Sequence, residues 1–211
     1  RLESELIEGT HRVEELKADL KTYMKQFLVS FEERDQVIRP MAENGQEAVG
    51  SMGDDTPMAV LSLKERNIAD YFRQQFAQVT NPPIDPLREA IVMSLETCVG
   101  AERNVFQETP EHAQRVILKS PVLSPSKFAN LLELDRPGFK HQLLHMFFNE
   151  DETLAQGIRR LCDEAAEAVR AGVTLLVLTD RHLDLPGIRI PAAMICGAVH
   201  HHLIDLGLRC K

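Results

Sequence analysis

The chain has 211 residues, of which 44% are hydrophobic and 27% charged, so it is long enough for one core and an appendage. Its formal net charge of −8 argues against nucleic acid or an anionic membrane as partner, because both would repel most of its surface. No apolar run approaches the roughly 20 residues that span a bilayer. The four cysteines form no C-x-x-C pair, which is typical of reduced thiols in a cytosolic protein.

Residues 1–45 are predicted to form a helical lead-in ahead of an α/β domain at residues 46–211. Apolar residues recur at helical spacing through residues 1–29. The sequence Ser30-Phe-Glu-Glu33 matches a capping box, so a second helix is expected to start there and to end near Asn44-Gly45. Because each helix would bury only one stripe, we expect the lead-in to pack against a neighbouring domain.

The rest of the chain alternates short apolar runs with amphipathic segments. The apolar runs predict five strands, at residues 58–62, 90–95, 116–123, 143–148 and 173–179. The amphipathic segments predict helices at residues 64–78, 126–132 and 151–171, and a last helix that opens at Pro191 and ends near Asp205. The run at 173–179 is apolar throughout, as expected of a strand buried on both faces. Strands that alternate with helices indicate parallel βαβ units, so the predicted fold class is α/β, either open or barrel-like.

Two loops beside predicted strands contain the most unusual chemistry of the chain. Residues 50–57 contain two glycines, which tolerate a positive φ, and end in a proline. Residues 80–89 contain three prolines within five positions, which excludes a helix interior or an inner strand there. We therefore expect a stiff, ordered connector at residues 80–89 that is fixed against another part of the protein.

Acidic residues in these loops suggest two kinds of site. Asp85 with Arg88 and Glu89 could serve as an acid–base cluster. The favoured interpretation is a first helical turn that Asp85 caps, with Arg88 bridging to a neighbouring domain. Asp54-Asp55 could bind Mg²⁺ through two carboxylates, but capping of loop amides and pairing with an arginine are again favoured.

Histidines are the next candidates for a metal site. His200-His201-His202 lie in the predicted last helix, where consecutive side chains point about 100° apart and cannot converge on one ion. Core packing and capping near the helix end are therefore expected. His141 and His145 are four residues apart, but the second falls in a predicted strand, and no third ligand can be named for either cluster.

The remaining polar and thiol groups give no stronger site. Asp180-Arg181 follows a predicted strand at its carboxyl end, where α/β folds bind ligands, although such a pair commonly only locks a turn. Cys98, Cys162 and Cys196 have no basic neighbour that would lower a thiol pKa, so they are predicted to be buried and unreactive. No G-x-G-x-x-G, P-loop or G-x-S-x-G motif occurs.

Three long stretches of unusual composition resemble one family. They are GSMGDDTPMAVLS at residues 50–62, DYFRQQFAQVTNPPIDPLREAIVMSL at residues 70–95 and IPAAMICGAVHHHLI at residues 190–204. These stretches are similar to the central domain of the large subunit of glutamate synthase, and the similarity extends over about residues 36–209. The chain begins without methionine and stops just after a helix-end signal, so we expect it to be a C-terminally incomplete piece of that domain.

The resemblance implies a role between two reaction centres. In this family a glutaminase domain releases ammonia, which passes through a tunnel to a barrel domain, where 2-oxoglutarate is aminated and reduced with FMN and an iron–sulfur cluster. The electron donor of the parent enzyme is NADPH, NADH or ferredoxin. The central domain joins these two partners in the same polypeptide and resembles an incomplete FMN barrel of βα repeats without a cofactor. Location in the cytoplasm, or in the plastid of a plant or alga, is implied as well.

The resemblance also assigns expected site residues. Thr80, and next Asn81, are expected at the mouth of the ammonia tunnel, with Asp85 and Arg88 in the same inter-domain loop. No catalytic, cofactor-binding or metal-binding residue of the family falls within the chain, so the isolated chain is expected to be inactive. Residues 98–103 and 135–140 differ from the usual family sequence, and the loops there are expected to differ.

A second hypothesis comes from a different functional class. The chain could be a free-standing α/β-barrel enzyme with its site at the carboxyl ends of the strands, near Asp54, Asp85 and Asp180. That hypothesis predicts flavin absorbance or a ligand-induced thermal shift in the purified chain, whereas a linking domain predicts neither.

Overall fold

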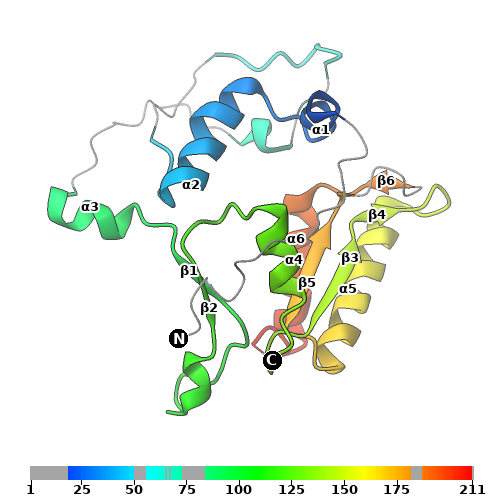
Figure 1. Cartoon of the computed structure of the whole chain (residues 1–211). Helices are drawn as coiled ribbons and strands as arrows, with labels where there is room; N and C mark the ends of the chain where they lie inside the picture. The colour runs from blue at the N-terminus through cyan, green and yellow to red at the C-terminus, as the bar shows by residue number, and fades with distance from the viewer. Residues whose placement is uncertain are drawn as a thin grey trace. The chain divides into compact units, whose positions relative to one another are not determined.

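The computed structural model describes residues 19–49, 56–64, 66, 68–72, 84–181 and 187–210. The structure divides into two compact units, which we describe separately (Figure 1). The core unit contains residues 98–118 and the described residues from 124 onward. The helical unit contains the described residues from 19 to 97 together with Lys119–Leu123.

The helical unit consists of short helices with well-defined ends. They are α1 (Leu20–Gln26), the π-helix η2 (Glu33–Ile38), α2 (Arg39–Asn44), the 3₁₀-helix η3 (Ile68–Tyr71) and α3 (Pro86–Val92). The amide of Glu33 donates to the Ser30 hydroxyl at 3.1 Å, and the Glu33 carboxylate accepts from the Ser30 amide at 2.8 Å. This reciprocal pair confirms the predicted capping box. The helical segment ends at Asn44, as predicted, because Gly45 adopts a left-handed conformation with φ of 61°.

Hydrogen bonds hold the end of α2 in place. The Glu47 amide donates to the Met93 carbonyl at 2.8 Å, and the Leu95 amide donates to the Gly45 carbonyl at 2.8 Å. The Ser120 hydroxyl donates to the Met41 carbonyl at 2.7 Å. A Cβ atom at Gly45 would lie 2.2 Å from the Lys119 carbonyl oxygen, so only glycine fits there.

Two strand predictions for this unit, at residues 58–62 and 90–95, are wrong. Residues 58–62 contain a turn at Val60–Leu61 with side chains almost fully exposed, and no described strand pairs with them. The first half of residues 90–95 belongs to α3, because Asp85 and Pro86 start a helix that runs to Val92. Short apolar runs do not distinguish strands from helices by periodicity. Of the helix predicted at 64–78, the described part contains only the 3₁₀ turn η3.

The core unit contains most of the regular structure. Its elements are β1 (Thr97–Val99), η4 (Pro110–Ala113), β2 (Val116–Leu118), α4 (Pro125–Leu132), β3 (His141–His145), β4 (Phe147–Phe148), α5 (Leu154–Arg170), β5 (Leu175–Thr179), β6 (Ile188–Arg189) and α6 (Ala192–Asp205). β1 pairs with β2, β3 runs parallel to β5, and β4 runs antiparallel to β6.

A parallel β3–α5–β5 unit forms the centre of this core. The register pairs His141 with Leu175 and His145 with Thr179. α5 begins with a capping box in which Thr153 and Gln156 bond reciprocally, which agrees with the helix predicted at 151–171. Side chains of β3, α5 and α6 form one buried cluster, which includes Leu144, Leu161, Ala165, Ile195 and Val199. The predicted helices at 126–132 and from Pro191 to Asp205 are also confirmed.

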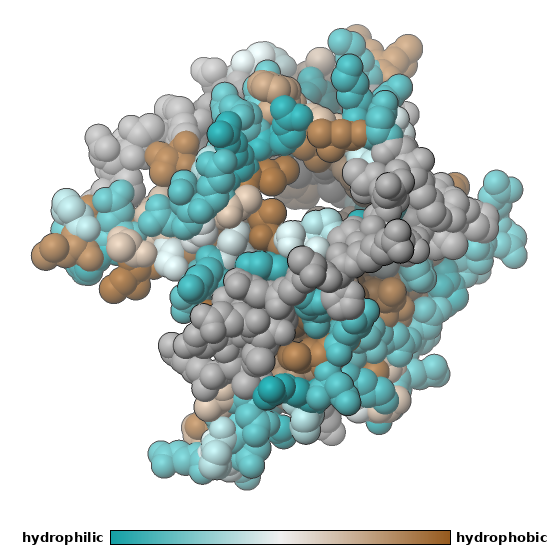
Figure 2. All heavy atoms as spheres, viewed as in Figure 1, coloured by the Kyte–Doolittle hydropathy of each residue, from teal (hydrophilic) through white to brown (hydrophobic). Residues whose placement is uncertain are grey.

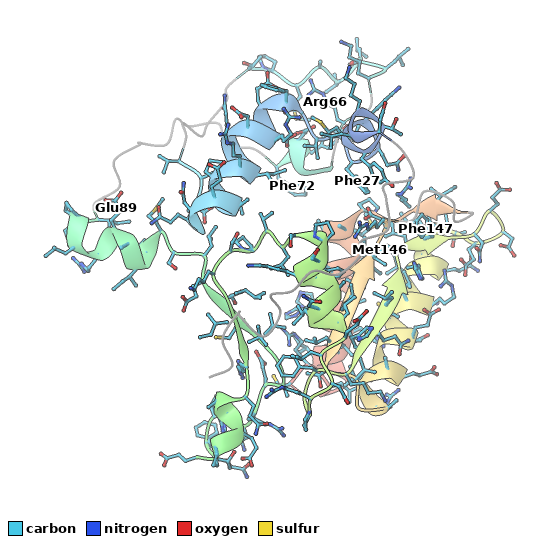
Figure 3. All side chains as sticks on the ribbon, in the orientation of Figure 1. Phe27, Arg66, Phe72, Glu89, Met146 and Phe147 are labelled. Carbon is cyan, nitrogen blue, oxygen red and sulfur yellow. The ribbon has the colours of Figure 1, made fainter. Side chains whose placement is uncertain are left out.

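The strands are shorter and less buried than the apolar runs predict. The strand predicted at 143–148 is interrupted at Met146, where the ribbon passes from β3 to β4 (Figure 3). The strand predicted at 116–123 ends at Leu118. All five residues of β5 are half-buried rather than buried on both faces. The described strands form no closed barrel, and in this part of the chain no helix is both long and apolar enough to cross a bilayer.

Candidate functional site

Asp85, which lies within the proline-rich connector, caps the first turn of α3. Its carboxylate oxygen Oδ1 accepts from the Leu87 amide at 3.1 Å and from the Arg88 amide at 3.0 Å. The other oxygen, Oδ2, forms a short ion pair with Nε of Arg88. The hydrogen bond from the Arg88 side chain, followed by that from its amide, lowers the pKa of Asp85 below its ordinary value. The predicted helical cap is therefore confirmed.

The structure places only part of the predicted inter-domain loop. Asp85 and Arg88 lie together at the start of α3, and Arg88 pairs with the carboxylate of its own turn. Bridging by Arg88 to a neighbouring domain stays a prediction. Thr80 and Asn81 lie outside the described residues, and so does Asp54-Asp55. Their roles stay predictions too.

α3 presents an uncovered apolar surface beside this cap. Leu87 is 89% exposed, Ile91 is 78% exposed and Val92 is 55% exposed. Figure 2 shows apolar side chains gathered over α3, at the left of the view, and Figure 3 labels Glu89 on the same helix. Exposed apolar groups that cluster in this way mark contact surfaces, because leaving them in water is unfavourable.

The histidine cluster is held by ordinary structural contacts. Nε of Arg209 donates to Nδ1 of His200 at 3.0 Å, and the His200 and His201 rings meet edge to face at 5.3 Å. Nε2 of His202 lies 3.6 Å from the Asp163 carboxylate. Among the residues that the structure describes, no three His, Cys, Asp or Glu side chains gather in a way that could hold a metal ion.

Asp180 and Arg181 lie in the turn that follows β5, as predicted. The Asp180 carbonyl accepts from Nε of Arg189 at 3.4 Å, and the Arg181 amide donates to the Thr179 hydroxyl at 3.3 Å. Both contacts use backbone groups, which agrees with a turn-locking role. Asp180 belongs to the core unit and Asp85 to the helical unit. The hypothesis that places both in one site stays a prediction.

The prediction of buried cysteines is correct only in part. Cys162 is buried in the core of α5, and this desolvation, with a smaller effect of the Asp163 charge, raises the pKa of its thiol. Cys98 and Cys196 are exposed, so the prediction is wrong for both. In α6 the buried residues are Ile195, Val199 and Leu203, and Cys196 lies about 100° around the helix from Ile195.

Two features of the core unit are not predicted by the sequence patterns. The first is a network in which Arg160 joins Glu152 at 2.8 Å, Glu164 at 3.0 Å and the carbonyl of Phe147 at 2.9 Å. Chiefly because of the Arg160 hydrogen bond, the pKa of Glu152 falls to about 2. Only the pair Arg160–Glu164 has a helical i,i+4 spacing that could have signalled it.

The second feature is a cavity of about 400 Å³ along β5. Its walls are β5 itself, Phe128, Leu131 and Leu132 of α4, and the side of α6 that carries Cys196 and His200. Leu208 and Arg209, just after α6, open onto it as well. No sequence motif signals this cavity, because its lining comes from segments that are far apart in the chain.

The chain is similar to a known domain family and to several curated proteins. Residues 22–211 match the family model of the glutamate synthase central domain. The chloroplastic ferredoxin-dependent glutamate synthase of Spinacia oleracea is 47% identical over 189 residues, which cover 87% of this chain and 12% of that protein. The large chain of the NADPH glutamate synthase of Azospirillum brasilense is 42% identical, with 92% of this chain and 13% of that protein covered.

A third relative aligns along the whole chain. The large chain of the NADPH glutamate synthase of Bacillus subtilis is 38% identical over 214 aligned positions, which cover 100% of this chain and 14% of that protein. The chain thus spans only a small part of the length of these curated relatives. Since the family model covers nearly all of its residues, the chain belongs to the glutamate synthase central domain family.

Proposed function

We propose that this chain acts as the central part of a glutamate synthase large chain, which uses glutamine, 2-oxoglutarate and a reductant to make two glutamate molecules. The family match over residues 22–211 carries this proposal. The relatives are named ferredoxin-dependent, NADPH and NADH glutamate synthases. Because similar central segments occur with all three electron donors, the donor is specified by parts of the enzyme other than this segment.

The proposed role is to join a glutaminase domain and an FMN-binding synthase domain of the same polypeptide. Exposed apolar side chains of the helical unit support this role, because Leu87 and Ile91 of α3 and Phe72 beside η3 are largely exposed, and exposed apolar groups favour contact with a partner surface. In the proposed arrangement residues 1–45 are the lead-in that packs on a neighbouring domain, and residues 46–211 are the partial α/β domain.

The proposed architecture of residues 46–211 is an incomplete barrel of βα repeats. In this arrangement β3 and α5 form one βα repeat, and β5 and α6 form the next.

Cofactors are expected in the flanking domains, namely FMN, an iron–sulfur cluster and NADPH, NADH or ferredoxin as donor. The proposed location is the cytoplasm, or the plastid for a plant or algal source, where the plant relatives are named chloroplastic.

Within this role Thr80 and Asn81 form part of the wall of an ammonia path. Hydroxyl and carbonyl groups along such a path can pass neutral ammonia by hydrogen bonds while apolar packing excludes water. Support comes from the end of the connector, where Pro86 and the Asp85 cap fix the chain as it enters α3.

The test is a substitution in the full enzyme. Thr80→Val removes the hydroxyl at nearly constant volume, so glutamine hydrolysis should exceed amination of 2-oxoglutarate, and Thr80→Ser should keep the two reactions coupled. The measurement is the steady-state yield of glutamate per glutamine consumed, which should fall from two toward one in Thr80→Val, because hydrolysis alone gives one glutamate per glutamine. Unchanged coupling in Thr80→Val would refute the tunnel role. Flavin absorbance of the isolated chain, or its thermal shift with a ligand, would instead favour the free-standing enzyme.

A further inference from the structure

The tract His200-His201-His202 of α6 lies where two other segments of the core unit meet this helix. α6 packs against α5, and the two helices share the buried core cluster. After α6 the chain folds back, and the Leu208 amide donates to the Leu203 carbonyl at 2.7 Å. Consecutive side chains of a helix point about 100° apart, so the three rings face different surroundings. Each ring therefore has its own partners.

The contact of His200 requires the neutral form of its ring. Nε of Arg209 carries a hydrogen and donates it to Nδ1 of His200 at 3.0 Å, so Nδ1 must offer a lone pair. The single proton of the neutral ring is then on Nε2. A second proton, on Nδ1, would leave two donors of like charge facing each other. Protonation of His200 thus breaks this contact.

Arg209 has a second partner within reach. Its Nη1 lies 4.0 Å from the carboxylate of Glu102, in the loop after β1. His200 and Arg209 line the cavity along β5, where Cys196 is the other titratable group among the described residues of the lining. The His201 ring meets the His200 ring edge to face. When His200 gains a proton, the guanidinium can therefore move from His200 to Glu102.

His202 has the opposite requirement. Its Nε2 is buried, has no hydrogen-bond partner in the described part of the chain and lies 3.6 Å from Oδ1 of Asp163 on α5. A neutral ring gains little from a contact of this length. A protonated ring directs both an N–H group and a positive charge at the carboxylate. Protonation of His202 thus strengthens the contact between α5 and α6.

The other charged groups around His202 leave the sign of this effect unchanged. On α5, Arg159 and Glu167 lie one turn before and one turn after Asp163, and their opposite charges largely cancel. On α6 itself, Asp205 lies three residues after His202 and carries the same charge as Asp163. The charges that face the ring are therefore negative on balance. Because the Asp163 side chain is 65% exposed, water screens the pair and its contribution is modest.

We propose that His200 and His202 form a proton-dependent device that changes how α6 is held. At higher pH the neutral His200 binds Arg209 and thereby fixes the turn after α6. As the pH falls, Arg209 moves to Glu102 and the turn loosens. In the same range His202 pairs with Asp163 and ties α6 to α5. Imidazole groups ordinarily change charge between about pH 5 and 8, so the device responds near neutral pH.

The two contacts respond to pH with opposite signs. The contact between Arg209 and His200 stabilises the fold while the ring is neutral, and this stabilisation is lost as the pH falls. The contact between His202 and Asp163 stabilises the fold at low pH, and this stabilisation is lost as the pH rises. Each contact therefore needs its own measurement. The inference does not depend on the tunnel role of Thr80, because its tests do not measure turnover.

Hydrogen exchange tests the contact of His200. The Leu208 amide reports on the turn, because it donates to the Leu203 carbonyl. Its protection factor, corrected for the intrinsic effect of pH on exchange, should fall roughly two- to tenfold between about pH 8 and 5.5. His200→Gln keeps a neutral acceptor for Arg209 at every pH, so it should abolish this fall. A fall of the same size in His200→Gln would overturn the proposal.

Thermal unfolding tests the contact of His202. Asp163→Asn removes the charge that faces the ring, so the native chain should exceed this variant in Tm by more at about pH 5.5 than at about pH 8. The expected change in this difference is about 1–4 °C, as for an exposed ion pair in a chain of this size. His202→Gln should show the same loss, and the double variant should lose no more. A Tm difference that is equal at both pH values would overturn the proposal.

His201→Gln is the matched control for both measurements. The His201 ring is exposed, and among the described residues it makes an edge contact with His200 but no hydrogen bond or ion pair. This variant removes one titrating ring from the same helix end, yet it should retain both pH responses. If it lost them as fully as the other variants, the responses would come from the total charge of the helix end, and the proposal would be wrong.

Discussion

The two units differ in what holds them together. Every buried hydrophobic side chain that the structure describes lies in the core unit, where β3, α5 and α6 contribute most of one cluster. The helical unit has apolar residues too, but Leu61, Leu63 and Leu87 are almost fully exposed. Caps at Asp85 and Ser30 and backbone bonds around Gly45 define its shape.

This difference indicates which unit is self-sufficient. Apolar burial contributes about 25 cal/mol per Å², so a unit with a packed cluster can offset the entropy of ordering its chain. Caps contribute only about 1 kcal/mol each, which is too little for that purpose. We therefore expect the described residues of the helical unit to contribute less to the free energy of unfolding than those of the core unit.

The largest expected effect separates the two units directly. Leu161→Ala should lower the free energy of unfolding by about 2–5 kcal/mol, because Leu161 is only 1% exposed and its removal leaves a cavity. Leu87→Ala is the matched control on α3 and should change it by no more than about 0.5 kcal/mol in the isolated chain. Urea unfolding followed by circular dichroism measures both. Equal losses would contradict the contrast between the units.

A glycine substitution should damage the helical unit alone. Gly45→Ala places a Cβ 2.2 Å from the Lys119 carbonyl, so the bonds around it must break. Gly207→Ala has a similar positive φ but no neighbour within 4 Å, so it carries only the backbone strain, about 1–2 kcal/mol. With Gly45→Ala, the amides of Glu47 and Leu95 should exchange faster with solvent, and amides of α5 should not. Faster exchange throughout α5 would show that the units unfold together.

The ion-pair network gives the core unit a defined dependence on pH. The pKa of Glu152 is about 2 in the folded chain, below its ordinary 4.5. The ionised Glu152 carboxylate therefore contributes its full share of the folding stability above pH 4.5, and this share is lost as the pH falls toward 2. Glu152→Gln should lower Tm at neutral pH and reduce the fall of Tm between pH 4.5 and 2. Glu150→Gln removes the same charge two residues away, outside the network, and is the matched control. Parallel profiles for all three proteins would disprove the role of the network.

The smallest effect concerns the cap of α3. Asp85→Ala removes both the cap and the partner of Arg88, whereas Asp85→Asn keeps a capping oxygen but loses the ion pair. Amides of α3 should therefore exchange fastest in the alanine variant and at an intermediate rate in the asparagine variant. Because the pKa of Asp85 is lowered, acidification below its ordinary range should weaken the cap only in the native chain. Identical exchange in all three would mean that α3 does not need its cap.

Long helices with a regular apolar pattern and clear end signals could be predicted from the sequence. α5 has an apolar face over four turns, a Thr153 cap and a glycine stop, and it forms where predicted. The Asp85 cap could also be predicted, because Asp before Pro is a local signal that needs no tertiary contact. The family could be identified from the unusual loops at 50–57 and 80–89.

Features that depend on tertiary partners could not be predicted. Residues 90–95 are apolar enough for a strand, but six residues do not reveal a period, and the upstream cap makes their first half helical. The break at Met146 arises because Phe147 and Phe148 pair with β6, a partner far along the chain. Arg160 reaches Glu152 eight residues away, a spacing that no helical rule singles out.

The segment Lys119–Leu123 prevents the two units from being produced as separate, uninterrupted fragments. The chain leaves the core unit after Leu118, contributes five residues to the helical unit and returns at Ser124. A gene divided at any single codon therefore cannot yield both units intact. A fragment ending at Thr97 would lack the serine hydroxyl that bonds to Met41, and a fragment starting at Cys98 would carry that loop without its acceptor.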